Sequence, residues 1–144
     1  MDFVPTFRVI KKHKDAILPT KTHVSDSGFD ITIISKLKTI GDVTFYDSGI
    51  VIEPDNDHYT LLFPRSSISK TGYMMANGVG VIDQSYRGTI IVALRKVDKS
   101  MPDLELPCRI AQIVPQKLIL PHFEVVETIS NTSRGDGGFG STGK

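Results

Sequence analysis

Short runs of apolar, β-branched and aromatic residues recur along the chain and are separated by turn residues. Runs of this length and composition are typical of β-strands that end at Gly, Pro, Asn or Asp. Eight prolines also disfavour long helices. The pattern therefore predicts an all-β sandwich or barrel, with strands over residues 7–10, 29–34, 50–52, 59–63, 89–94, 110–114 and 123–129.

One segment, residues 66–75, departs from this pattern and could form one or two helical turns. Ser66 or Ser67 is a candidate N-cap, because a hydroxyl oxygen can accept a hydrogen bond from a free N–H group of the first turn. The preceding Arg65 adds a fixed positive charge. This combination suits an oxyanion such as phosphate, although a plain helix cap explains the same residues.

Composition and charge limit the classes of function. The 144 residues suffice for one domain with a core, and the formal net charge of +1 offers no large basic surface, so nucleic acid is not an expected partner. No run approaches the roughly 20 apolar residues of a spanning helix, and no apolar leader follows Met1. We expect a cytoplasmic protein with no membrane partner, and a nuclear or organelle form stays open.

Three further stretches carry polar groups that a simple sandwich does not need. Asp30 lies between Phe29 and Ile31, where a buried carboxylate needs a cation, a hydrogen-bond partner or water, although an Asx-type turn is equally compatible. Gln112 lies in an apolar run that alternates in period two, with Arg109, Ala111 and Ile113 on one face, so it also needs a polar partner if its face is covered.

The third stretch, residues 77–88, resembles a hairpin. Its glycines would let a ring approach the backbone closely, and Asp83 at the turn is a candidate base that could orient a water molecule. Turn formation by Asp83 and Gly88 and packing by Tyr86 are the structural alternative.

The C-terminal residues RGDGGFGSTGK contain five of the chain's 12 glycines around Phe139. Composition alone favours a disordered terminus. A flexible tail, however, does not require the aromatic residue.

Taken in order, GFD, PRSS, GVIDQSYRG, RIAQ and RGDGGFGSTG closely resemble the five motifs of the trimeric dUTP pyrophosphatases, the dUTPases. The resemblance spans residues 28–143, and the third and fifth motifs are long enough to be specific. It implies a dUTPase-like β jelly roll or distorted barrel over residues 1–130, with one short helix. Residues 131–144 would be a glycine-rich C-terminal arm that is exchanged between subunits and closes an active site. The resemblance further implies a homotrimer whose active sites are shared between subunits.

The resemblance also implies a reaction. Family members hydrolyse dUTP to dUMP and pyrophosphate by attack of water on the α-phosphorus, with Mg²⁺ as cofactor, which limits uracil incorporation into DNA and supplies dUMP for dTTP synthesis. Asp83 matches the catalytic aspartate, and Asp30 matches the aspartate that contacts Mg²⁺ through its water ligands. Arg87 matches a position that ties the motifs together. The phosphate-binding positions match Arg65, Ser66, Ser67, Gln112, Arg134, Ser141 and Thr142. The uracil and deoxyribose positions match Asn77, Gly80, Val81, Ile82, Tyr86, Ile91, Phe139 and Gly140.

The chain departs from common family patterns at Phe29, Ser67, Gln84-Ser85 and Asp136. Two rivals are a dCTP deaminase of the same fold, and a catalytically idle, dUTPase-like trimer used for binding or regulation. A deaminase needs a glutamate beside the cytosine ring, and the hairpin offers only Gln84. A catalytically idle trimer would not need to retain the family's site residues, and their presence in this chain speaks against loss of activity. The retained residues are Asp30, Asp83, Tyr86, Gln112 and Phe139.

Overall fold

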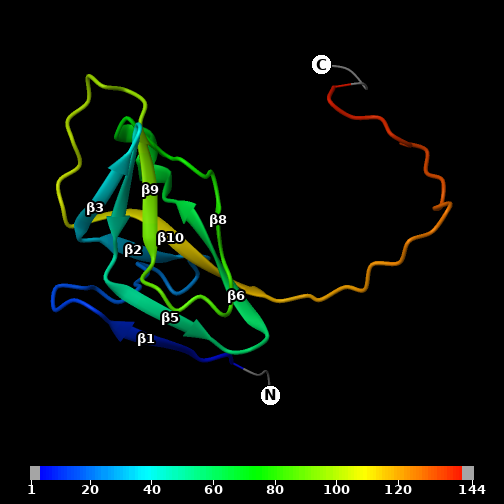
Figure 1. Cartoon of the computed structure of the whole chain (residues 1–144), viewed down its shortest axis with the longest axis horizontal. Helices are drawn as coiled ribbons and strands as arrows, with labels where there is room; N and C mark the ends of the chain where they lie inside the picture. Colours follow the sequence, from blue (N-terminus) through cyan, green and yellow to red (C-terminus); the bar gives the residue numbers. More distant parts are fainter. Residues whose placement is uncertain (1–3, 141–144) are drawn as a thin grey trace.

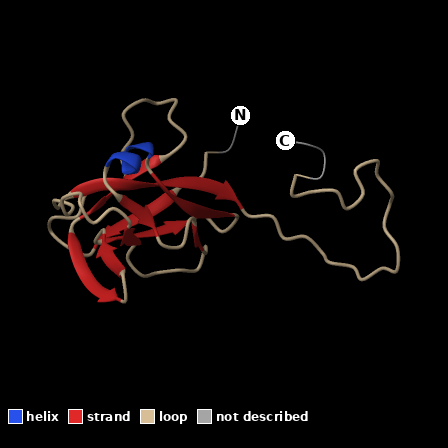
Figure 2. Cartoon of the chain, turned by 90° about the horizontal axis from the view of Figure 1, so that it is seen from above, coloured by secondary structure: helices blue, strands red, loops and turns tan. Residues whose placement is uncertain are grey.

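The computed structural model describes residues 4–140, so the predictions for Ser141 and Thr142 lie outside the described residues. The described chain contains ten β-strands and one short 3-10 helix, which confirms the all-β prediction (Figure 2). Across residues 4–140, no helix has the length and apolar character needed to cross a membrane.

Two four-stranded antiparallel sheets form the body, with a two-stranded ribbon beside them (Figure 1). The first sheet runs in the order β2 (Phe29–Ile33), β10 (Cys108–Lys117), β6 (His58–Pro64) and β8 (Gly80–Ile82). The second sheet runs in the order β3 (Ser35–Ile40), β4 (Val43–Asp47), β9 (Ile91–Lys96) and β7 (Tyr73–Met75). The ribbon pairs β1 (Phe7–Lys11) with β5 (Ile50–Pro54).

The core lies where the inward faces of these strands meet. On β9, Val92 and Leu94 are buried while their neighbours Ile91 and Ala93 are half-buried, which is the period-two pattern of a strand with one face covered. Ile31 and Ile33 of β2 are fully buried in the same cluster. The core thus fixes the two sheets against each other and leaves Ile91 on the opposite side of β9.

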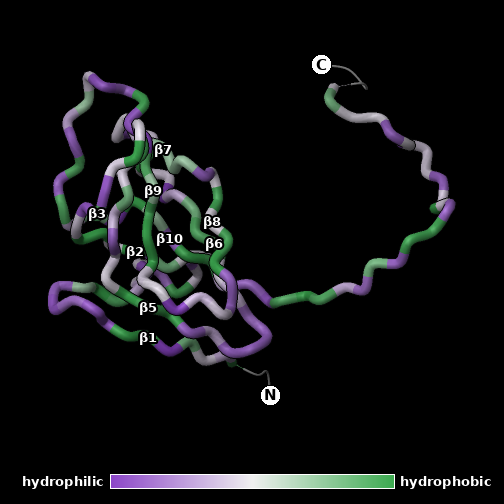
Figure 3. Tube along the Cα trace, in the orientation of Figure 1, coloured by the Kyte–Doolittle hydropathy of each residue, from purple (hydrophilic) through white to green (hydrophobic). Residues whose placement is uncertain are grey.

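The predicted strand over residues 123–129 is wrong. The last strand ends at Lys117, and the segment after it extends away from the body without secondary structure (Figures 1 and 2). Parts of this segment are apolar, as the green stretches of the trace in Figure 3 show, and their side chains are exposed, with Phe123 at 88% and Val125 at 100%. The residues are suited to a strand, but a strand needs a neighbour for its backbone hydrogen bonds, and the described chain folds none against them.

Three strands, β3, β4 and β7, were not predicted, and β8 was expected only as an arm of the hairpin over residues 77–88. β3 is SKLKTI and is exposed throughout, so its sequence has no buried face to reveal. β4 reads VTFYD, and β7 and β8 are only three residues long. These strands depend on pairing with neighbours rather than on local composition.

The helical turn is η1 (Ser66–Lys70), a 3-10 helix. Its N-cap is Arg65, and no side chain makes a capping hydrogen bond. The prediction of Ser66 or Ser67 as N-cap is therefore wrong.

Candidate functional site

Residues 77–88 do not form a hydrogen-bonded hairpin. β8 pairs with β6 in the first sheet, whereas β9 pairs with β4 and β7 in the second. The two arms therefore belong to different sheets, and side chains rather than a backbone ladder line the space between them. This separation corrects the hairpin prediction and creates a pocket.

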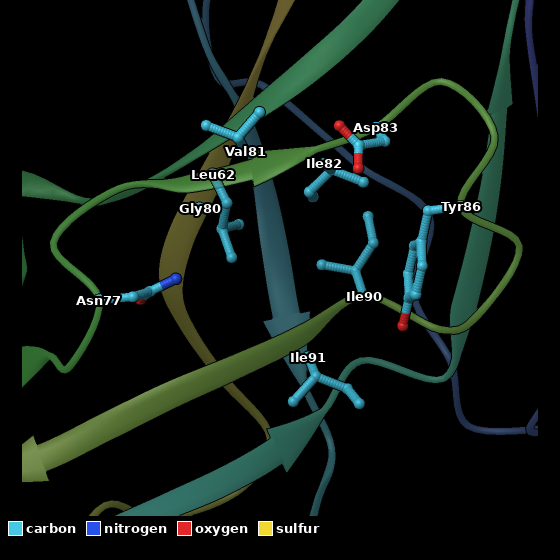
Figure 4. Close-up of a pocket in the computed structure, with 9 residues that line it drawn as sticks. All are labelled: Leu62, Asn77, Gly80, Val81, Ile82, Asp83, Tyr86, Ile90 and Ile91. Atoms are coloured by element: carbon cyan, nitrogen blue, oxygen red, sulfur yellow. The ribbon is translucent and has the colours of Figure 1, made fainter.

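The pocket between β8 and β9, here called the β8–β9 pocket, has a volume of about 220 Å³ (Figure 4). It is lined by Leu62, Asn77, Gly80, Val81, Ile82, Asp83, Tyr86, Ile90 and Ile91. All the predicted site residues of the third motif lie here, together with the predicted Ile91. Leu62 and Ile90 were missed. Leu62 faces Gly80 through the β6–β8 register, which a single sequence does not reveal.

Figure 4 shows Asn77 at one end of the pocket and the Asp83 carboxylate with the Tyr86 ring at the other. The walls between them are aliphatic, so the pocket suits a flat, weakly polar ring. A ligand group that forms hydrogen bonds with the Asn77 amide would therefore lie at the opposite end of the pocket from the Asp83 carboxylate.

Tyr86 is held in place by its own loop. Its hydroxyl donates a hydrogen bond to the Thr89 carbonyl at 2.7 Å, and its backbone N–H donates to the Asp83 carbonyl at 3.0 Å. A Cβ atom on Gly88 would collide with the Tyr86 hydroxyl, so the loop needs glycine there. Gly88 thus makes room for the Tyr86 ring, and that ring lines the pocket.

A second cavity, here called the polar cleft, has a volume of about 270 Å³ and contains Asp30, Arg65, Ser66 and Gln112 from the phosphate and metal predictions. The Asp30 carboxylate is only 12% exposed and lies 3.0 Å from Nε of Arg65 and 3.7 Å from Nη1 of Arg109. Arg65 also donates a hydrogen bond to the Arg109 carbonyl at 2.7 Å. Asp30 therefore has the cationic partners that its burial requires, and it lies within a strand rather than in an Asx turn. The other lining residues are Thr22, Asp26, Ser27 and Gly28.

Gln112 reaches the polar cleft from the centre of the first sheet. It lies opposite Asp30 on one side and Phe63 on the other, and its amide donates to the Pro64 carbonyl at 3.1 Å. A Cβ atom on Gly28 would collide with the Gln112 amide, so the glycine makes room for it.

The predicted alternation along this strand is wrong at its start. A register shift between Cys108 and Ala111 leaves Arg109 exposed and Ala111 buried. The bulge places one extra residue on β10, which breaks the shared face expected for these two residues.

The two cavities share no lining residue. Ser67 lies on η1 but outside the lining of the polar cleft. In the arm, Arg134 binds the Gly137 carbonyl at 2.8 Å, and Phe139 and Gly140 lie on the exposed segment away from both cavities (Figures 1 and 2). One described chain therefore gathers the predicted residues into three separate places.

A metal has few protein ligands here. Within residues 4–140, no group of three or more His, Cys, Asp or Glu side chains is placed to hold an ion. Asp30 is a single carboxylate already faced by two guanidinium groups. This donor set fits Mg²⁺ that keeps most of its water and is held mainly by phosphate groups, and it does not fit an ion held by protein alone.

The comparisons with known proteins agree with the motifs. The family model described as dUTPase matches residues 14–143. The deoxyuridine 5'-triphosphate nucleotidohydrolase of Rhodococcus erythropolis is 38% identical over 133 residues, which cover 90% of this chain and 80% of the relative. The corresponding protein of Corynebacterium glutamicum is 35% identical over 147 residues, covering 100% of this chain and 99% of the relative.

Solved structures show the same fold. The dUTPase of Staphylococcus bacteriophage 80alpha, solved with dUPNHPP, superposes with a TM-score of 0.81 at 24% identity and covers 96% of this chain and 99% of its own. A mutant dUTPase from phage phi11 of S. aureus, which coordinates a structural Mg(II) ion, has a TM-score of 0.73 at 19% identity and covers 88% of this chain and 99% of its own. Both likenesses concern the jelly-roll architecture.

Proposed function

Because this chain belongs to the dUTPase family, we propose that it binds dUTP in the β8–β9 pocket and hydrolyses it to dUMP and pyrophosphate. The observation that carries this proposal is the convergence on one pocket of Asn77, Asp83 and Tyr86, from the segments that flank β8, and Ile91 of β9, a strand of the other sheet. Its role would be to limit uracil incorporation into DNA and to supply dUMP for dTTP synthesis.

The pocket accounts for the choice of base. The Asn77 amide offers both a donor and an acceptor at one end, which matches the mixed pattern on the edge of uracil. Cytosine exchanges a donor for an acceptor and would leave buried polar groups unpaired, which is a costly mismatch. An aliphatic wall against C5 of uracil would exclude the extra methyl of thymine. Tyr86 at the opposite end packs against deoxyribose, so a 2′-hydroxyl would be excluded.

The carboxylate of Asp83 would act beyond the sugar, where the α-phosphate would lie. We propose that it orients a water molecule and accepts its proton as the oxygen bonds to the α-phosphorus. The bond from the α-phosphorus to the bridging oxygen breaks, and pyrophosphate leaves with that oxygen. Asp83 then returns the proton to solvent.

The polar cleft provides the groups that a triphosphate needs. Arg65 and Ser66 bring a positive charge and a hydroxyl, and Gln112 adds an amide donor. Mg²⁺, when bound, would neutralise charge on the phosphates, with Asp30 as the residue that holds it through water ligands. Together these groups keep the phosphates aligned for displacement.

We propose that the chain assembles into the homotrimer that the family resemblance implies, and the fact that these two sets of residues do not meet within one chain supports assembly. Apolar side chains on the extended segment, such as Phe123 and Val125, also need a covering surface. The body offers an apolar groove of about 390 Å³ beside strand β1, whose outer edge has no neighbour among the described strands. A second copy supplies both the missing half of the site and a cover for these surfaces.

The test is a nucleotide panel. Purified protein with Mg²⁺ is given dUTP, dCTP, dTTP or UTP, and pyrophosphate and ammonia release are followed separately. We expect pyrophosphate from dUTP at a rate at least about 100-fold above the other three nucleotides. Ammonia release from dCTP would identify the deaminase, and dUTP binding without turnover would identify an idle, regulatory trimer.

A further inference from the structure

The loop that carries Asp83 and Tyr86 is anchored to a strand outside the β8–β9 pocket. Gln84 donates a side-chain hydrogen bond to the Pro54 carbonyl of β5 at 3.1 Å. Nε of Arg87 lies 3.3 Å from Oε2 of Glu53 on the same strand. The loop is therefore tied from its middle to β5, in addition to its two ends on β8 and β9.

Arg87 also holds the loop together internally. Its Nη1 donates to the Gln84 carbonyl at 2.5 Å and to the Tyr86 carbonyl at 3.1 Å. One guanidinium group thus joins two carbonyls of the loop to one carboxylate of β5. Any shift of that carboxylate would be passed to the residues on both sides of Ser85.

Glu53 lies on β5 of the ribbon, and its side chain is also held by Arg8 of the partner strand β1. Its Oε1 accepts from Nε of Arg8 at 2.5 Å, and Nη1 of Arg8 contacts Oδ1 of Asp55 at 3.1 Å. The hydrogen bond from Arg8 is the main reason that the pKa of the Glu53 carboxyl is lowered, and Arg87 lowers it further. Both carboxylate oxygens are therefore engaged, each by a different guanidinium group.

We propose that Glu53 is a positioning residue for the reaction: it acts through Arg87 to hold Asp83 and Tyr86 at the mouth of the pocket. This inference rests on the proposed function. The exposed ion pairs contribute little stability on their own, but a displacement of about 1 Å at a reacting group can cost a factor of about 100 in rate.

The same arrangement explains one departure from the family pattern. The family resemblance implies that an acidic residue is common in the stretch Gln84-Ser85; this chain has glutamine at position 84, whose amide is a donor and can reach the Pro54 carbonyl. A carboxylate has no proton to donate at neutral pH. Gln84 is thus a second anchor of the same loop on the same strand.

The experiment compares Glu53→Ala and Glu53→Gln with the wild type. We expect Glu53→Ala to lower kcat for dUTP about tenfold while KM changes less than about threefold, because the uracil end of the pocket stays intact. Glu53→Gln keeps one acceptor oxygen for two guanidinium groups, so its kcat should lie between those of Glu53→Ala and the wild type.

Asp42→Ala is the matched control. It removes another exposed ion pair, Asp42 Oδ2 to Arg95 Nε at 2.8 Å, which has no contact with the loop. We expect its kcat to stay at the wild-type value. An equal loss of kcat in this control would overturn the positioning role.

Hydrogen exchange provides a readout that does not depend on turnover. Backbone amides of residues 83–88 should exchange faster in Glu53→Ala than in the wild type and should be unchanged in Asp42→Ala. The inference is overturned if exchange in this loop is unaltered, or if Glu53→Ala lowers only the melting temperature and keeps the wild-type kcat. A wild-type protein that fails to hydrolyse dUTP would instead refute the proposed function.

Discussion

The β8–β9 pocket and the polar cleft are built in opposite ways. The pocket has aliphatic walls and one carboxylate, and most of its lining comes from the continuous stretch 77–91. The cleft is charged and collects residues from widely separated segments through sheet register, with Gln112 lying opposite Asp30. One half can select a base and the other can hold phosphates, so each is incomplete for hydrolysis without the other.

The largest expected effect comes from removing the only carboxylate of the pocket. Asp83→Asn should reduce kcat for dUTP by a factor of about 10² to 10⁴, the usual contribution of a general base. Binding of dUTP, measured by calorimetry, should stay close to the wild-type affinity because shape and size are retained. Asp15→Asn, an exposed loop residue, is the control. Turnover of Asp83→Asn within threefold of wild type would remove Asp83 from its role.

Deleting the end of the C-terminal arm tests whether the β8–β9 pocket and the polar cleft are sufficient for activity. Deleting residues 134–144 removes Phe139 and Arg134 and should leave a folded oligomer whose kcat/KM for dUTP falls by a factor of about 100, since no residue then excludes water from the bound nucleotide. Light scattering checks the oligomer, and pyrophosphate release checks the activity. A truncated protein with full activity would show that the arm has no part in closing the site.

Two arginines face the Asp30 carboxylate of the polar cleft, and of these Arg65, but not Arg109, lines the cleft. Arg65→Ala should raise KM for dUTP about 10- to 100-fold through the loss of a charge-assisted contact to phosphate. Arg109→Ala should change KM less than about threefold, because its side chain is 55% exposed and lies farther from Asp30. Steady-state kinetics of the two variants decides between a specific phosphate contact and a general effect of positive charge. Equal changes would favour the general effect.

A smaller effect is expected from one added methyl group. Gly28→Ala should displace the Gln112 amide and raise KM for dUTP about three- to tenfold. The double variant with Gln112→Ala separates this displacement from a general disturbance, because Gly28→Ala should add nothing once the amide is gone. If the effects of the two substitutions on KM add, Gly28→Ala does not act by displacing the Gln112 amide.

Local sequence chemistry alone predicted neither the pocket nor the cleft. Asn77, Asp83 and Ile91 are close in the chain, but the hairpin predicted for this stretch is wrong because β8 and β9 belong to different sheets, and only the family resemblance named Asn77 and Ile91 as site residues. The contact between Asp30 and Gln112 depends on register, and only the family resemblance placed them together in advance. Leu62 was missed for the same reason, since its approach to Gly80 is set by the β6–β8 pairing.

The errors in the fold have similar origins. The apolar run over residues 123–129 was expected to be a strand, yet it has no partner strand in the described chain. In contrast, β3 forms although all of its residues are exposed, because β4 provides its hydrogen bonds. Composition indicates the capacity to be a strand, and pairing decides whether one forms.

The central claim is that one active site combines the β8–β9 pocket of one chain with the polar cleft of another. At dUTP concentrations well below KM, Asp83→Asn and Arg65→Ala should each hydrolyse dUTP at about a tenth of the wild-type rate or less. The decisive measurement is dUTP hydrolysis under these conditions after the two variants are unfolded and refolded together in equal amounts. Random assembly gives roughly a quarter of the sites an intact Asp83 and an intact Arg65 from different chains. We predict recovery to about that fraction of wild-type activity. If the mixture is no more active than the two variants measured apart, each site lies within one chain and the claim is wrong.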